Sequence, residues 1–208
     1  DDMPNGKILP QTRLGAIVKR ESEVLRELKL ELSPGTMKLA ELYAKHVGGV
    51  FLNQYFNPWN PESWARLGPQ LYDLFGGELT EVFCDLGSTG YLRGLGQYMK
   101  DRDPNIRIIA THPYFKRKIA GLRGPERLAE VAEWEHVPHY VEAIDERTAQ
   151  RYSEELFRHA GIPAGESGGA GYGMGDHYYL ELAARGELNE PHVGLVRFMD
   201  TFIPYSLI

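Results

Sequence analysis

The chain has 208 residues and a formal net charge of −6, and 42% of its residues are hydrophobic. These values predict a globular protein with one large domain or a domain and a half. Lysine and arginine are scattered, which argues against nucleic acid or an anionic membrane as the main partner. No apolar run reaches the roughly 20 residues of a membrane span and no signal-peptide pattern occurs, so we expect a cytoplasmic location. Cys84 is the single cysteine, which excludes an internal disulfide and a cysteine-based zinc site.

The first quarter of the chain predicts helices between short strands. A helix is expected from Thr12, its cap, through apolar positions up to Leu28, and a second over residues 37–46. Strand-like segments lie at residues 7–9, 30–32 and 50–52. Residues 57–61 predict a rigid loop, and residues 64–75 a helix that ends at Gly76.

Residues 82–100 are the centre of the predicted fold. Residues 82–84 suit a buried strand, residues 87–90 a turn of small residues, and Leu92, Leu95 and Met99 a helix. Unpaired N–H groups and the positive end of the helix dipole favour phosphate at such a turn. Because glycine turns also occur as plain packing units, this spacing alone leaves both interpretations open.

Strands and helices alternate through the rest of the chain. Strands are predicted at residues 106–110, 139–144 and 193–198, with helices at 127–134, 146–160 and from Ser167 to about Arg185. This order predicts an α/β fold with a mostly parallel sheet and helices on both faces. Ligands of such sheets lie beyond the carboxyl ends of the strands, so Gly87, Ser167 and Thr201 are expected to face one cleft.

Five segments resemble, in order, the cysteine synthase and cystathionine β-synthase group of fold-type II pyridoxal-phosphate enzymes. Residues 53–62 are similar to its Gln-Phe-x-Asn-Pro-Ala-Asn-Pro segment, and residues 85–100 to its Gly-Val-Gly-Thr-Gly-Gly-Thr helix entry. The other matching segments are residues 68–71, residues 161–171, and Asp200-Thr201 with Tyr205. The resemblance implies pyridoxal 5'-phosphate as cofactor, an amino-acid substrate and a higher oligomer.

The resemblance also implies roles for individual residues. Thr201 maps to a residue whose hydroxyl forms a hydrogen bond with the pyridine nitrogen of the cofactor, which favours β-elimination and β-replacement. Gln54 maps to a substrate-binding glutamine. The residues implied to hold the cofactor phosphate are Gly87, Ser88, Thr89, Gly90 and the N–H of Tyr91. Without the resemblance, Thr201 and Gln54 are ordinary polar residues that satisfy the backbone.

The Schiff-base lysine of the family lies upstream of the matching region, and no lysine here has its context. We therefore expect no catalytic residue on this chain and a second polypeptide, from a split gene or a cleaved chain, that carries the lysine and the amino-terminal part of the fold. The alternative is that this part belongs to upstream residues of the same chain. Residues 1–52 are assigned to the remainder of a small substrate domain, and residues 53–208 to a large cofactor-binding domain. We also expect that a family glycine loop between Thr111 and Val137 is missing, and that Glu166 and Gly168 alter the second loop.

Two other functions stay open: a non-catalytic, partner-binding relative with a vestigial cofactor pocket, and a nucleotide-phosphate binder. The second lacks the acidic residue expected about 20 residues after the glycine turn. The polar cluster Glu133, Glu135, His136 and His139 is interpreted as solvent-facing, with no metal expected.

Overall fold

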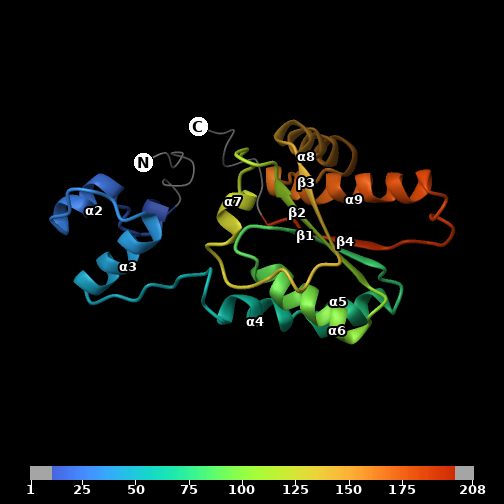
Figure 1. Cartoon of the computed structure of the whole chain (residues 1–208), viewed down its shortest axis with the longest axis horizontal. Helices are drawn as coiled ribbons and strands as arrows, with labels where there is room; N and C mark the ends of the chain where they lie inside the picture. Colours follow the sequence, from blue (N-terminus) through green and yellow to red (C-terminus); the bar gives the residue numbers. More distant parts are fainter. Residues whose placement is uncertain (1–10, 200–208) are drawn as a thin grey trace. The chain divides into compact units, whose positions relative to one another are not determined.

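The computed structural model describes residues 11–199, which fall into two compact units (Figure 1). The first unit ends at Asn53 and the second begins at Gln54. The assignment of residues 1–52 and 53–208 to a substrate and a cofactor domain stays a prediction.

The first unit contains α2 (Glu21–Glu27) and α3 (Thr36–His46). The second helix is close to its predicted span. The long helix expected from Thr12 is wrong, because Gly15 adopts a φ of +87° and only α2 continues toward Leu28. The strands expected at residues 30–32 and 50–52 are also wrong, since the described part of this unit offers no strand to pair with them. The strand expected at residues 7–9 lies outside the described residues.

The second unit opens with two helices where one was predicted. They are α4 (Trp59–Ala65) and α5 (Gly68–Phe75). The first begins inside the expected loop, because Asn57 Oδ1 accepts a hydrogen bond from the backbone N–H of Trp59 at 3.0 Å. Pro69 lacks an N–H group and is confined to the first turn of a helix, which explains the break before α5.

A four-stranded parallel sheet forms the centre of this unit. Its strands are β1 (Glu81–Asp85), β2 (Arg107–Pro113), β3 (Tyr140–Ile144) and β4 (Gly194–Val196). They lie in the order β3-β2-β1-β4, and every neighbouring pair is parallel. The predicted α/β fold with a mostly parallel sheet is therefore confirmed.

Helices cover both faces of the sheet, because strand side chains alternate between the faces. Phe83 and Ile109 pack against Met174 and Tyr178 of α9 (Glu166–Ala184). The opposite face packs on η1 (Leu92–Gly96), a π-helical turn, and on α6 (Gln97–Arg102). In Figure 1, α8 (Glu146–Ala160) and α9 lie on one side of the sheet and α4, α5 and α6 on the other, while α7 (Pro125–Leu128) is a single turn. None of the helices in residues 11–199 combines the length and apolar character of a membrane span.

Candidate functional site

The small-residue turn lies between β1 and the helical segment that starts at Gly90, at the carboxyl edge of the sheet. Thr89 is buried with a φ of +61°, and its hydroxyl donates to the carbonyl oxygen of Ser88 at 2.7 Å. Gly87 and Ser88 are half-buried. The turn is therefore fixed by its own contacts while part of its backbone reaches the surface.

The backbone N–H groups of this turn are available to a ligand. Within residues 11–199, no acceptor takes the N–H of Gly87, Ser88 or Thr89. The N–H of Gly90 reaches only the Ser88 hydroxyl, at 3.5 Å. Several unpaired N–H groups at a helix start attract a phosphate or another anion, so the residues present fit a phosphate-bearing cofactor.

Asn60 links the predicted substrate segment to this turn. Its Nδ2 donates to the carbonyl oxygen of Gln54 at 2.7 Å and to Ser88 Oγ at 3.0 Å. The Gln54 side chain itself is exposed. Sequence reasoning gave Asn60 no role of its own, although it lies in the Asn-Pro-Trp-Asn-Pro segment that carried the resemblance.

A second glycine turn, at Gly121, covers the first one. Gly121 has a φ of +90°, and its carbonyl oxygen lies 2.5 Å from where a Cβ on Gly87 would stand. A Cβ on Gly121 would lie 3.2 Å from Ser167 Cβ, and Glu166 accepts a hydrogen bond from the N–H of Ala120 at 3.1 Å. Gly87 and Ser167 thus both border the turn at Gly121. That they face one cleft stays a prediction, and Thr201 lies outside the described residues. A glycine turn therefore lies between Thr111 and Val137, while the absence of the family's own glycine loop stays a prediction.

A partly buried ion pair joins the ends of β1 and β4. Arg197 Nη2 lies 2.7 and 2.9 Å from the two carboxylate oxygens of Asp85. The guanidinium carbon lies 4.4 Å from the ring centroid of Tyr91 and 5.1 Å from that of Trp64, a cation–π arrangement. Sequence reasoning missed this pair, because its members stand far apart in the chain.

The Tyr91 side chain belongs to the core. Burial raises the pKa of its phenol, and its Oη has no hydrogen-bond partner among the described residues. Here only the backbone N–H of Tyr91 is left for the predicted role.

Four lysines of the described chain pair with carboxylates or carbonyl oxygens. Lys100 Nζ donates to the carbonyl oxygens of His136 and Val137 at 2.9 and 3.0 Å. Lys19 pairs with Glu27, and Lys38 and Lys45 both pair with Glu41, whose pKa these two lysines lower to about 2.

The acidic-histidine cluster does not converge on one point within residues 11–199. His139 instead accepts a hydrogen bond from the N–H of Ile108 at 3.0 Å, and burial lowers its pKa. A different trio, Glu142, His177 and Glu181, brings its ligand atoms within 4.8 Å of one another on β3 and α9.

A parallel α/β sheet with a glycine turn at its carboxyl edge defines a class of proteins that bind phosphate-bearing ligands there. The family described as pyridoxal-phosphate dependent enzyme matches residues 1–196. The chain belongs to this family, whose cofactor is pyridoxal phosphate. The predicted family, fold class and cofactor are therefore confirmed.

The chain is similar to several cysteine synthases. Cysteine synthase B of Pseudomonas aeruginosa is 28% identical over 76% of this chain and 53% of its own length. Cysteine synthase 3 of Caenorhabditis elegans is 32% identical over 51% of this chain and 33% of its own length. The crystal structure of an O-ureido-L-serine synthase superposes with a TM-score of 0.71 and 27% identity, over 85% of this chain and 57% of that one. The chain thus spans between a third and just over half of the length of these relatives.

Proposed function

We propose that this chain is one subunit of a split pyridoxal-phosphate enzyme of the cysteine synthase group. The enzyme catalyses β-replacement or β-elimination on a serine-derived amino acid. The observation that carries this proposal is the row of unpaired N–H groups from Gly87 to Thr89, in a chain that belongs to the family. The cysteine synthase relatives support the reaction class.

The residues of this chain bind and orient. The N–H groups of residues 87–91 and the Ser88 hydroxyl would hold the phosphate, and Asn60 fixes that hydroxyl. Thr201 would face the pyridine nitrogen, and Gln54 the substrate carboxylate. When bound, the cofactor supplies an electron sink for carbanion chemistry at the substrate.

The lysine of the reaction would come from a partner chain, so the active form is a heteromer in the cytoplasm. Four of the described lysines support this, because Lys100, Lys19, Lys38 and Lys45 are held by other groups. The proposal assigns to the partner the part of these relatives that the match does not cover, since the match spans 53% of the cysteine synthase B of Pseudomonas aeruginosa.

A charge substitution in the turn tests the phosphate role in the complex. Ser88→Asp and Ser88→Asn both keep a side-chain oxygen that can accept from Asn60, but only aspartate adds a negative charge beside the phosphate. We expect Ser88→Asp to lower the affinity for pyridoxal phosphate about tenfold or more, which corresponds to at least about 1.4 kcal/mol, while Ser88→Asn changes it little. Cofactor absorbance during titration gives both affinities, and equal values would refute the phosphate role.

A second candidate function is a non-catalytic subunit that binds a partner. It is favoured by the tight packing of the two turn glycines. Added Cβ atoms on Gly87 and Gly90 would meet Gly121 and Asn60 at 2.5 and 2.0 Å, so both glycines are required even without a ligand. A purified complex that takes up no pyridoxal phosphate would select this function over the first.

A further inference from the structure

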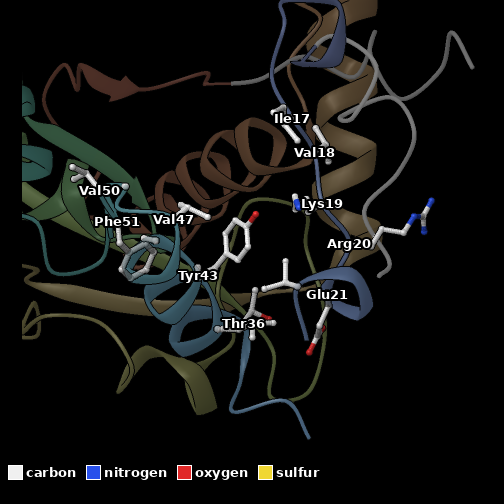
Figure 2. A pocket seen from close by; sticks show the side chains of 15 residues that line it. Ile17, Val18, Lys19, Arg20, Glu21, Thr36, Tyr43, Val47, Val50 and Phe51 are labelled. Atoms are coloured by element: carbon white, nitrogen blue, oxygen red, sulfur yellow. The ribbon is translucent and has the colours of Figure 1, made fainter. Parts of the chain in front are cut away.

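The groove of the first unit is lined mainly by apolar side chains. It lies between α2 and α3 and has a volume of about 720 Å³ (Figure 2). Two of its polar groups are already engaged, because Lys19 and Tyr43 both contact the carboxylate of Glu27. Within residues 11–199, three metal-ligating side chains gather at one point elsewhere, on β3 and α9 of the second unit.

These side chains are Glu142, His177 and Glu181. Each offers one imidazole nitrogen or carboxylate oxygen, and the three atoms lie within 4.8 Å of one another. His177 and Glu181 stand four residues apart on α9 and therefore share a face of that helix. Glu142 lies on the same sheet face as Ile144, which belongs to one apolar cluster with Ala170 of α9. The strand and the helix thus present their ligands to each other.

Groups outside the trio orient both carboxylates. Glu142 Oε2 accepts a hydrogen bond from Tyr140 Oη at 3.0 Å. Glu181 Oε2 accepts one from Arg185 Nη2, also at 3.0 Å. The Oε1 atoms of Glu142 and Glu181 lie 3.4 and 3.8 Å from nitrogens of the His177 ring. Outer donors that hold one oxygen of a carboxylate in this way direct its other oxygen toward a metal ion.

The separations and the charges of the trio suit zinc. Zn²⁺ binds imidazole nitrogen and carboxylate oxygen at about 2.0–2.2 Å, so its tetrahedral ligands lie roughly 3.3–3.6 Å apart. The His177 side chain is 52% exposed, which gives its ring room to turn and to shorten the longest separation. Like charges as close as the carboxylates of Glu142 and Glu181 are unfavourable without a cation.

We propose that Glu142, His177 and Glu181 form a zinc site that joins β3 to α9. One nitrogen of His177 and the Oε1 atom of each glutamate bind the ion, and water fills the fourth position. Because β3 is an edge strand of the sheet, the ion fastens that edge to a helix. The spacing of residues along the chain does not reveal this site, since its ligands come from two separate elements. The site goes beyond the proposed function and does not depend on it.

A zinc titration of the full chain, purified without a tag, against a chromophoric chelator tests the site. We expect one equivalent of Zn²⁺ to bind, and His177→Ala to lower its affinity at least tenfold, which corresponds to about 1.4 kcal/mol. His159→Ala is the matched control, because His159 is another exposed histidine, on α8, and this variant should leave the affinity unchanged. Equal affinities of His177→Ala and the parent chain, or no bound zinc, would overturn the site.

Three further variants test the individual groups. Glu142→Gln and Glu181→Gln keep the shape of the side chain but remove its charge, and each should weaken zinc binding by roughly tenfold or more. Tyr140→Phe removes only the hydroxyl that orients Glu142, and it should weaken binding about tenfold to a hundredfold, the usual effect of losing an outer partner. A glutamine variant that binds zinc as tightly as the parent chain would overturn the three-ligand arrangement.

Urea unfolding shows whether the ion fastens the strand to the helix. A ligand that binds only the folded state raises the free energy of unfolding, and the fluorescence of Trp59, Trp64 and Trp134 reports on the second unit. Zinc should raise the urea midpoint of the parent chain and not that of His177→Ala, whose fold is checked by circular dichroism. An equal shift in both proteins would overturn the inference. Because no pyridoxal phosphate is present in these measurements, a failure of the proposed function does not affect their outcome.

Discussion

Gly90 stands where the helix after β1 passes closest to Asn60. A Cβ at Gly90 would lie 2.0 Å from Asn60 Oδ1, and Asn60 is tied to Gln54 and Ser88. Because this neighbour cannot move freely, we expect Gly90→Ala to lower the free energy of unfolding by about 1–3 kcal/mol, the usual cost of overpacking. All three tryptophans, Trp59, Trp64 and Trp134, lie in the second unit, so their fluorescence in urea reports on this unit.

Gly171→Ala is the matched control for this substitution. Its Cβ would lie 3.4 Å from Val196, an ordinary contact, and alanine has the better helix propensity. Equal losses of stability in the two variants would show that the contact with Asn60 is not what requires glycine at position 90.

The Asp85–Arg197 pair gives a second prediction at this scale. Arg197→Ala leaves a carboxylate that is 9% exposed without its cation. We expect a loss of about 2–3 kcal/mol in the free energy of unfolding, because an unpaired buried charge is costly. The double variant Asp85→Ala/Arg197→Ala should recover part of this loss in urea unfolding followed by fluorescence. Strictly additive effects would mean that the two residues do not interact.

Among the helices, α8 has a cap whose strength depends on pH. Asp145 Oδ1 accepts from the N–H of Thr148 at 3.0 Å, and hydrogen bonds from the Thr148 hydroxyl and backbone lower the pKa of Asp145. Asp145→Ala should cost about 1 kcal/mol at pH 7. Because the pKa in the folded state is below the unfolded value of about 3.9, the stabilisation is complete above that pH. It is lost as the pH falls through the folded pKa, so the two proteins should converge in acid.

Asp145→Asn separates the hydrogen bond from the charge. Asparagine caps a helix about as well as aspartate but does not titrate. The difference between Asp145→Asn and Asp145→Ala in unfolding free energy should therefore stay constant between pH 7 and pH 3. If the difference in unfolding free energy between Asp145→Asn and Asp145→Ala also disappeared in acid, the pH dependence would come from a group other than Asp145.

The same helix shows which elements the sequence predicts well. The span of α8 matches its prediction because Asp145 and Gly161, with a φ of +67°, define both ends locally. The glycine turn after β1 was also readable from local spacing. Local spacing does not decide the structure of residues 30–32 and 50–52, because a strand exists only beside another strand. The site pairs Asn60–Ser88 and Asp85–Arg197 were missed since they join distant parts of the chain.

Taken as a whole molecule, the chain has two units with very different cores. In the first unit the buried hydrophobic residues are Val24 and Leu39 among the residues described. The second unit has three apolar clusters around a four-stranded sheet. Local stability follows buried apolar contact, so the two units should open with different free energies.

Amide hydrogen exchange measures this difference directly. In the isolated chain we expect the amide of Leu39 in α3 to exchange at least roughly a hundredfold faster, after correction for intrinsic rates, than that of Met174 in α9, since opening free energies range from near zero to the global value. Equal protection of the two amides in the isolated chain would mean that the first unit is as stable as the second, against the difference in their buried apolar contacts.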